Sequence, residues 1–343
     1  CVSPHDTMKR ILIVTVNWLG DAIMTTPALR ALKRAIPDTY VALMGTGRVR
    51  DVYAQNPYLD EFIEFDERST HRRLTAKLSF IAFLRAQKFD TVFLIHRSFT
   101  RAFMCLLAGI PRRIGWKRPK TCGIVNYPVT PRACPVHRQD HYLHLFEQAG
   151  IPVVDRNPEV FVSSQEHAIA HTLLGAQAIG NTPIVGIHVA ANWELKRWPA
   201  ERFAELADLL AKKHHCTILF TGAEPDAALV SRVTGQMSTQ AAMLCGKTSI
   251  RQLAALITHM RMFISNDSGP AHLAASLGVP TLVIFGPTSP ALTAPRGRSV
   301  TVVSGKHDCG LPCYRHDCSD NRCMRAVSVE DVYFRARTIL ISS

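Results

Sequence analysis

The segment Ile264–His272 combines residue types that can bind an anion. It reads Ile-Ser-Asn-Asp-Ser-Gly-Pro-Ala-His and lies between two apolar runs. This pattern predicts a strand, a sharp polar turn and a helix whose N-cap is Asp267 or Ser268. Gly269 lets a ligand approach the backbone, and the free N–H groups and dipole of the helix attract negative charge. His272 follows Ser268 by four residues and can face the same site. The alternative is a well-capped helix without a ligand.

A carboxylate follows the first apolar run of the chain. Asn17-Trp-Leu-Gly-Asp21 comes directly after Arg10–Val16, which has the composition of a buried parallel strand. Gly20 allows a tight turn, so Asp21 is expected at the start of a helix and at the mouth of the sheet. A carboxylate there can simply cap the helix, or it can act as a general base.

Polar groups also follow predicted strands in the second half of the chain. One long loop carries Asn192 and Lys196, and a cation after a strand can neutralise a pyrophosphate and stabilise a leaving group. Glu224 follows the next strand and suits ribose hydroxyls, and Thr248 follows a third and can line a base pocket. Each residue also has a plain structural interpretation, as a solvated side chain or a helix start. Their convergence at consecutive strand ends favours a nucleotide site.

Strands and helices alternate along both halves, which predicts an α/β fold with parallel sheets and helices on both faces. The expected strands are 10–16, 40–44, 61–65, 91–95, 183–188, 217–220, 243–244, 262–265 and 281–285. The expected helices are 21–35, 48–55, 72–87, 98–108, 137–149, 164–178, 200–213, 226–236, 250–257 and 329–340, together with the capped helix near 268.

This alternation predicts two doubly wound, Rossmann-like domains. The first spans 8–155 and the second 183–327, with a linker region over 156–182 and a C-terminal helix over 328–343. Three prolines in 151–158 indicate where the linker begins. We expect the carboxyl ends of the strands in the two sheets to face a central cleft, because ligands of open α/β sheets bind there.

The composition narrows the class of protein. The chain has 343 residues, 47% of them hydrophobic, and a formal net charge of +13. No apolar run is long enough to span a bilayer, and the first residues, which begin at Cys1, lack the pattern of a signal peptide. The charge suits nucleic acid, an anionic membrane surface or a phosphorylated substrate. A nucleic-acid motif is not evident, so a solvated basic surface is the alternative. The basic residues of the first half include Arg68, Arg72, Arg73, Lys77, Arg97, Arg101, Arg112, Arg113, Lys117, Arg118 and Lys120.

Four of the ten cysteines cluster near the C-terminus, with His307 and His316 close by in the sequence. Their spacings are looser than the paired Cys-x2-Cys of a zinc ribbon. A metal or redox site and a loop of reduced thiols are both open, and reduced thiols are the default. The four are Cys309, Cys313, Cys318 and Cys323.

These motifs together resemble the heptosyltransferases of lipopolysaccharide core synthesis, a glycosyltransferase family (family 9) with the GT-B fold that uses ADP-heptose. The resemblance covers almost the whole chain, and Asn-Trp before Leu-Gly-Asp is most similar to the branch that adds a second heptose to the first. The family usually has Leu or Met where this chain has Pro270. The matching segments are Asn17-Trp-Leu-Gly-Asp21-Ala-Ile-Met, Pro27-Ala-Leu-Arg-Ala-Leu, Phe89-Asp90, Arg112-Arg-Ile-Gly115, Lys196-Arg-Trp-Pro199, Asn266-Asp-Ser-Gly-Pro-Ala-His272 and Phe285-Gly-Pro-Thr-Ser-Pro290.

The resemblance implies a role for each matching residue. Asp21 would deprotonate the acceptor hydroxyl, and Lys196 would bind the diphosphate. Glu224 would hold the ribose, and Thr248 would lie near the adenine. Asn192, Asp267, Ser268, Gly269 and His272 would complete the nucleotide-sugar site, and Asn17, Arg112 and Arg113 the acceptor side.

The resemblance also implies the reaction and its partners. Heptose would move from ADP-heptose to a lipopolysaccharide inner-core acceptor with inversion, without a metal or other cofactor. The enzyme would be a cytoplasmic monomer that does not bind nucleic acid, and contact with the inner membrane stays open. Three alternatives also stay open: another GT-B transferase or epimerase, a basic nucleic-acid-binding protein, and a non-catalytic nucleotide-sugar sensor.

Overall fold

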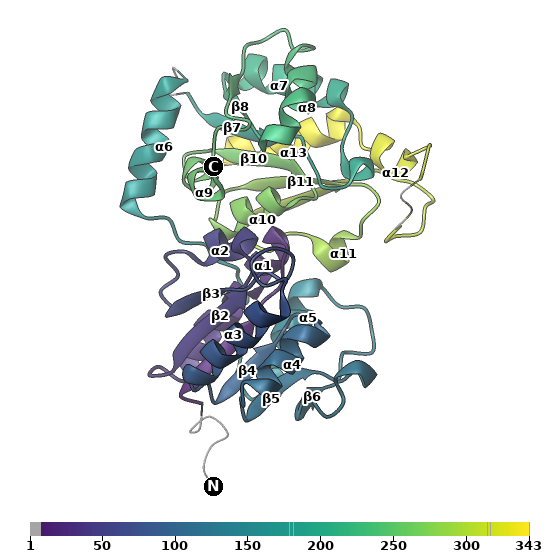
Figure 1. Ribbon diagram of the computed structural model, residues 1–343. Coiled ribbons are helices and arrows are strands. Elements are labelled where there is room, and N and C mark those ends of the chain that lie inside the picture. Colours follow the sequence, from purple (N-terminus) through teal and green to yellow (C-terminus); the bar gives the residue numbers. More distant parts are fainter. Residues whose placement is uncertain (1–7, 178, 181, 314, 316, 343) are drawn as a thin grey trace. The chain divides into compact units, whose positions relative to one another are not determined.

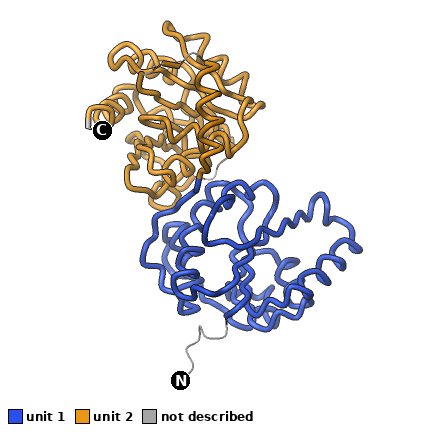
Figure 2. Tube along the Cα trace, turned by 90° about the vertical axis from the view of Figure 1, so that its left-hand side faces the viewer, with its two compact units in different colours: residues 1–161 blue, residues 162–343 orange. Residues whose placement is uncertain are grey.

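The structure is a computed structural model in which the chain divides into two compact units, residues 1–161 and 162–343 (Figure 2). Each unit contains one six-stranded sheet, and all strand pairs are parallel. Cys1 and His316 lie outside the described residues. The described residues are 8–177, 179–180, 182–313, 315 and 317–342.

The sheet of unit 1 has the order β3-β2-β1-β4-β5-β6 (Figure 1). Its strands are β1 (Arg10–Val14), β2 (Tyr40–Gly45), β3 (Glu61–Glu64), β4 (Thr91–Leu94), β5 (Arg112–Trp116) and β6 (Tyr127–Val129). Its helices are α1 (Leu19–Ala35), α2 (Gly47–Tyr53), α3 (Leu74–Ala86), α4 (Phe99–Leu107), η1 (Pro119–Thr121) and α5 (Arg138–Gln148).

The strand order of unit 1 determines which face each helix covers. From β1 the chain moves outward to β3 and then returns to β4 on the other side of β1. Because parallel crossovers are right-handed, the helices before and after this reversal cover opposite faces. Accordingly, α3 packs against α4, and α1 packs against α2 and α5. The central strand β1 is almost entirely buried because both faces are covered.

Unit 2 repeats this topology, with the order β12-β11-β10-β7-β8-β9 (Figure 1). Its strands are β7 (Ile184–His188), β8 (Thr217–Thr221), β9 (Ala242–Met243), β10 (Met262–Asn266), β11 (Thr281–Phe285) and β12 (Val300–Ser304). Its helices are α6 (Ser164–Ala176), η2 (Glu194–Lys196), α7 (Ala200–His214), η3 (Glu224–Asp226), α8 (Ala227–Thr234), α9 (Ile250–Ile257), α10 (Gly269–Ser276), α11 (Pro290–Thr293), α12 (Arg322–Arg325) and α13 (Val329–Ser342). The long helix α13 packs on α7 and β12, and α6 packs on α9.

The predicted α/β class with two doubly wound parallel sheets is confirmed. The sequence pattern did not predict β5 or β12 as strands. β5 begins with Arg112 and Arg113, which broke the apolar run, and β12 is a partly exposed edge strand with alternating Val and Thr. Of the predicted linker region, 156–161 belongs to unit 1 and the rest, with α6, to unit 2. Among the described residues, none of the helices is both long and apolar enough to cross a membrane.

Candidate active site

The carboxyl edge of the unit 2 sheet collects the polar residues singled out in the second half of the sequence. Strands β10, β7, β8 and β9 are neighbours, so the loops that follow them lie along one edge. The loop after β7 carries Lys196, the loop after β8 carries Glu224, and the loop after β9 carries Thr248. Asp267 follows β10 directly. The topology therefore brings these groups to one edge, as their spacing predicts.

Lys196 and Asp267 form a buried ion pair at this edge. The Lys196 Nζ lies 2.7 Å from Asp267 Oδ2, and the two side chains are 17% and 6% exposed. The hydroxyl of Thr288, in the loop after β11, donates to the same oxygen at 2.7 Å. The carboxylate thus holds the ammonium in a fixed place. A phosphate and this carboxylate repel each other, so Asp267 is suited to orient Lys196 rather than to contact an anion itself.

Asn266 fixes the loop that carries Lys196. Its side-chain Nδ2 donates to the carbonyl of Val189 at 2.8 Å, and its Oδ1 accepts from the backbone N–H of Trp198 at 3.0 Å. The Arg197 guanidinium donates to the Ala191 carbonyl inside the loop. Because Asn266 is fully buried and contacts both ends of the loop, it holds Lys196 at the strand edge without touching it.

The predicted capped helix is α10, and its N-cap is Ser268. The side chain of Ser268 does not cap the helix; its Oγ lies 2.8 Å from the Ser265 Oγ. Gly269 and Pro270 are the first two helical residues, and Pro270 has no N–H to leave unsatisfied. His272 is buried on the same helix. The positive end of the dipole of this eight-residue helix therefore lies next to the Lys196–Asp267 pair.

The loops after β8 and β9 contact each other. The N–H of Gly246 donates to the Gly222 carbonyl at 2.9 Å, and a Cβ on Gly246 would lie 3.2 Å from the Cα of Glu224. Gly246 has a φ of +72°, a conformation that favours glycine. This close approach brings the Glu224 and Thr248 loops together. Glu224 and Asn192 are exposed, and Thr248 is half-buried.

In unit 1, Asp21 lies in the first turn of α1, directly after β1. It is buried, and its Oδ1 accepts a hydrogen bond from the Tyr142 hydroxyl at 2.9 Å and from Arg138 Nη1 at 3.2 Å. Burial, and next the Asp21 charge, raise the pKa of Tyr142 far above its usual range, so this phenol stays protonated and donates. Both partners come from α5, which packs on α1. The arrangement fixes an ionised carboxylate at the carboxyl edge of the sheet.

Asn17 lies beside His96 and Arg101 at the same edge. Its Nδ2 is 3.1 Å from His96 Nε2, and Arg101 Nη1 donates to its Oδ1 at 3.3 Å. Burial, together with the Arg101 charge, lowers the pKa of His96 to about 4, so the imidazole is neutral at physiological pH. Arg101 is buried and also faces Glu67 at 3.7 Å. Asn17 is therefore held by a buried polar network one turn before Asp21.

The structure places Arg112 and Arg113 at the other end of the unit 1 sheet. They open β5, and Arg112 pairs with Thr91, the first residue of β4. The Arg113 guanidinium donates to the carbonyls of Ile124 at 2.6 Å and Ile110 at 2.5 Å, and Arg112 stacks over the Tyr127 ring. Five strand residues separate the two edges by roughly 13 Å. The fold thus does not bring these two arginines together with Asn17 and Asp21.

Comparison with known proteins places this geometry in a family. The sequence model of glycosyltransferase family 9 (heptosyltransferase) matches residues 77–323, which is well over half of the chain. The chain belongs to glycosyltransferase family 9. The family that the sequence motifs resembled is therefore confirmed, and with it the assignment of the chain as a glycosyltransferase.

Individual relatives and solved structures agree with this family assignment. Lipooligosaccharide heptosyltransferase 2 of Haemophilus ducreyi is 29% identical over 308 residues, which cover 86% of this chain and 88% of that protein. A family 9 glycosyltransferase structure from Veillonella parvula has a TM-score of 0.91 at 25% identity and covers 98% of both chains. The structure of Escherichia coli ADP-heptose heptosyltransferase II has a TM-score of 0.81 at 22% identity, over 97% and 99% of the two chains. The predicted GT-B fold class is confirmed.

Several residues of this family 9 site were not found from the sequence. Tyr142 and Arg138 lie about 120 residues after Asp21, and Thr288 lies 21 residues after Asp267. The spacing of Arg138 and Tyr142, four residues apart on one helix, shows that they share a face but not which residue they meet. Thr288 belongs to the motif Phe285–Pro290, which carried no role in the sequence interpretation.

The four clustered cysteines of the family 9 chain are free thiols in the structure. Cys323 is buried, which raises the pKa of its thiol, and the backbone N–H of Cys313 donates to the Pro287 carbonyl at 2.8 Å. In the part of the chain that the structure describes, groups of three or more His, Cys, Asp or Glu arranged to hold a metal ion are not found. The cysteine segment therefore supports the loop that carries Thr288.

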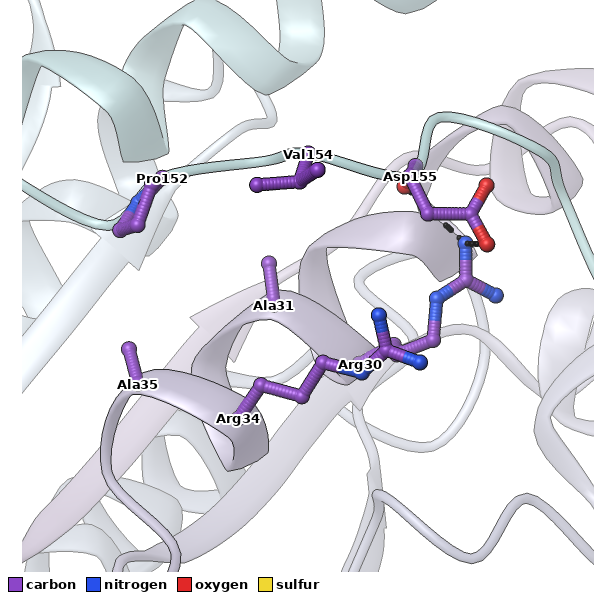
Figure 3. A pocket seen from close by; sticks show the side chains of 7 residues that line it. All are labelled: Arg30, Ala31, Arg34, Ala35, Pro152, Val154 and Asp155. Carbon is purple, nitrogen blue, oxygen red and sulfur yellow. Dashed lines mark hydrogen bonds and ion pairs between the residues drawn. The ribbon is translucent and has the colours of Figure 1, made fainter.

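A hollow of about 270 Å³ in unit 1 lies apart from these residues, between α1 and the extended segment after α5 (Figure 3). Its rim is fixed by ion pairs, because Arg30 contacts Asp155 Oδ2 at 3.1 Å and Glu159 Oε1 at 2.6 Å. These contacts tie the segment after α5 to α1, which carries Asp21. The lining residues are Arg30, Ala31, Arg34, Ala35, Pro152, Val154 and Asp155.

Proposed function

We propose that this chain transfers L-glycero-D-manno-heptose from ADP-heptose to the inner core of lipopolysaccharide, onto the first heptose, with inversion at the anomeric carbon. The family supports the sugar-transfer chemistry, and relatives named lipopolysaccharide or lipooligosaccharide heptosyltransferase 2 support the position. The donor heptose carbon is attacked by an acceptor hydroxyl, whose proton goes to a base. The bond to ADP breaks, and ADP leaves with the electron pair.

The observation that carries this proposal is the cluster of Lys196, Asp267 and Thr288 beside the N-terminus of α10. A fixed ammonium and a helix N-terminus both stabilise the negative charge that develops on a departing diphosphate. We assign the diphosphate to Lys196 and to the first turn of α10, at Ser268 and Gly269. His272 and Asn192 complete this side of the site, and Asp267 positions Lys196.

We assign the nucleoside to the paired loops after β8 and β9. Glu224 is exposed there, and its carboxylate accepts two hydrogen bonds from vicinal ribose hydroxyls in the proposed complex. Thr248, in the adjoining loop, lies near the adenine. The contact between Gly246 and the Glu224 backbone supports a shared pocket for these two parts of the nucleoside.

Asp21 is the proposed general base. Tyr142 and Arg138 both donate to its Oδ1, so we assign proton abstraction to Oδ2, the oxygen that neither of these two bonds uses. Base catalysis of this kind contributes roughly 10²–10⁴-fold in rate. The mechanism requires the Asp21 carboxylate and the Lys196 ammonium to act on the same pair of substrates.

We propose that Arg97 and Arg138, rather than Arg112 and Arg113, contact the acceptor. Arg97 is exposed just after β4, and its Nη2 lies 2.9 Å from His141 Nε2. Arg138 is 45% exposed and already contacts Asp21. Guanidinium groups bind phosphate and carboxylate in two-point geometry, which suits a phosphorylated sugar acid. Asn17 lies at the same edge and belongs to this acceptor side.

The proposed enzyme works without a resident cofactor, with ADP-heptose as its co-substrate. We place it as a monomer at the cytoplasmic face of the inner membrane, where a lipid-linked acceptor is reached, and we expect no nucleic-acid partner.

Product analysis by mass spectrometry tests the proposed function. The protein is offered ADP-heptose together with two truncated acceptors, one ending in the sugar acid and one carrying the first heptose. The proposal predicts a mass gain of one heptose on the second acceptor alone. Transfer only to the heptose-free acceptor would reassign the position. Transfer from UDP- or GDP-sugars but not from ADP-heptose would overturn the proposed donor.

A further inference from the structure

An apolar surface on unit 1 lies outside the proposed active site. Five large apolar side chains on α3 and α4 are exposed to solvent, with Leu74 at 72% and Phe99 at 50%. We call this surface the α3–α4 face. Its residues are Leu74, Leu78, Phe99, Phe103 and Leu107.

The two helices present these side chains as one surface. On α4, Phe99, Phe103 and Leu107 follow one another at intervals of four residues, and the first two rings stack with centroids 5.8 Å apart. On α3, Leu74 and Leu78 have the same spacing. The helices pack side by side (Figure 1), and Arg85 on α3 donates to the Leu107 carbonyl at 2.6 Å. Since residues four apart share a helix face, the two rows lie on neighbouring helices.

The charge around this face is concentrated and of one sign. From Arg68 to Gln139 the sequence contains fifteen Lys and Arg and a single acidic residue, Asp90. The Asp90 carboxylate is taken by the backbone N–H groups of Lys9 and Arg10, at 2.8 and 2.6 Å. Neither α3 nor α4 contains an acidic residue. Exposed cations near the face are Arg72, Arg73, Arg85, Lys88, Arg97 and Lys120.

We propose that the α3–α4 face docks on the surface of a bilayer rich in anionic phospholipid. Apolar side chains with basic neighbours are the composition that enters the headgroup region, with the rings and leucines at the acyl boundary and the cations on the phosphates. An exposed apolar surface of this extent marks an interaction site in a soluble domain. The charge complementarity selects an anionic lipid surface.

The charge and apolar content together disfavour two other occupants. Phosphate contacts with nucleic acid use the cations but leave five large apolar side chains without a partner. A second copy of the same face brings like charges together, which costs free energy. A lipid surface satisfies both components.

The position of the face suits a lipid-linked acceptor. Helices α3 and α4 begin just after the carboxyl ends of β3 and β4, and Asn17 and Asp21 lie at that same edge of the sheet. Docking through this face therefore brings the proposed acceptor side of unit 1 to the membrane. The docking itself depends on surface chemistry and is independent of which sugar is transferred.

Vesicle co-sedimentation tests the docking directly. The full chain is mixed with vesicles of phosphatidylethanolamine and phosphatidylglycerol, or of phosphatidylcholine alone, at low and moderate salt. The test variant combines Leu74→Ser, Leu78→Ser and Phe103→Ser. The matched control is Phe334→Ser, because Phe334 is 59% exposed on α13 of unit 2. A second variant, Arg72→Gln with Arg73→Gln, removes charge without touching the apolar residues. Circular dichroism melting checks that each variant is folded.

The proposal predicts binding to the anionic vesicles that falls with salt and is at least about tenfold weaker in both test variants. The Phe334→Ser control should bind like the parent chain. Equal binding of all variants, or equal binding to phosphatidylcholine, would overturn the proposal. So would tight binding to duplex DNA without vesicle binding, or a dimer that the triple substitution dissociates. Because sedimentation does not involve sugar transfer, a failure here is distinct from a failure of the proposed reaction.

Discussion

The Nζ of Lys196 lies 2.7 Å from Oδ2 of Asp267, and the hydroxyl of Thr288 donates to that same oxygen. Three loops thus fix one ammonium at the carboxyl edge of the unit 2 sheet. The proposed leaving-group site depends on this placement, since a cation that is already oriented loses little entropy when a diphosphate binds.

Substitutions at the two partners separate contact from positioning. Lys196→Ala should weaken ADP binding about tenfold or more, because it removes the cation that meets the diphosphate. Asp267→Asn should weaken it less, because the ammonium remains but loses its fixed position. Isothermal titration calorimetry with ADP measures both dissociation constants.

The double variant provides the control for this pair. If Asp267 acts through Lys196, the double variant should bind ADP about as weakly as Lys196→Ala alone. Strictly additive losses would instead mean that Asp267 contacts the ligand independently of Lys196.

Tyr142→Phe should lower kcat about tenfold and leave ADP affinity unchanged. A hydrogen bond to a charged group is worth about 1.5–3 kcal/mol, and its loss both loosens the Asp21 carboxylate and disfavours its charged form. The acidic limb of the kcat profile should therefore move to higher pH. Steady-state kinetics between pH 5 and 9 measures both effects.

The matched control for Tyr142 is Tyr127→Phe, an exposed tyrosine on β6. It should leave the profile unchanged. A Tyr142→Phe enzyme with reduced kcat and an unshifted pH profile would show a general packing effect, and the positioning role would be rejected.

Arg97 and Arg113 should respond in opposite ways to substitution. Arg97→Ala should raise the acceptor KM several-fold, since its exposed guanidinium lies on the proposed acceptor side. Arg113→Ala should instead lower stability by about 1–2 kcal/mol, because the carbonyls of Ile124 and Ile110 lose a charged donor. Acceptor titrations and urea unfolding distinguish the two. A raised acceptor KM for a folded Arg113→Ala enzyme would restore this residue to the acceptor site.

The contrast between these arginines shows where sequence reasoning reaches its limit. Asp21 and Lys196 were located correctly at strand ends because a turn after an apolar run is a local pattern. Arg113 looked like a free surface cation, since its carbonyl partners depend on β5, a strand that the two arginines themselves concealed. Tyr142 and Thr288 meet their partners only after the sheets form, and a single sequence carries no local signal for such contacts.

Low pH should destabilise unit 2 through His188. Burial lowers the pKa of this histidine from 6.5 to about 4, and its only printed polar neighbour, the Thr221 hydroxyl, is 3.4 Å from Nδ1. Above pH 6.5 the folded and unfolded states both hold a neutral ring. As the pH falls toward 4 the unfolded state binds a proton that the folded state resists, so stability falls by roughly 3 kcal/mol at 1.36 kcal/mol per unit.

Urea unfolding at pH 7.5 and pH 4.5 measures this loss. His188→Gln should shrink the difference between the two pH values, whereas His215→Asn, at an exposed histidine with positive φ, should not. His96 and His141 also have lowered pKa values, but they are less buried and are retained in both variants. An equal pH dependence in parent and His188→Gln proteins would remove His188 from this account.

The turnover number of Asp21→Asn with ADP-heptose and a heptose-bearing acceptor tests the central claim most directly. The asparagine keeps the size of the side chain and can still contact Tyr142, but it cannot accept the acceptor's proton. The account predicts that kcat falls by about 10²–10⁴-fold while the dissociation constant for ADP stays near that of the parent enzyme. A kcat within a few-fold of the parent value would contradict the assignment of Asp21 as the base.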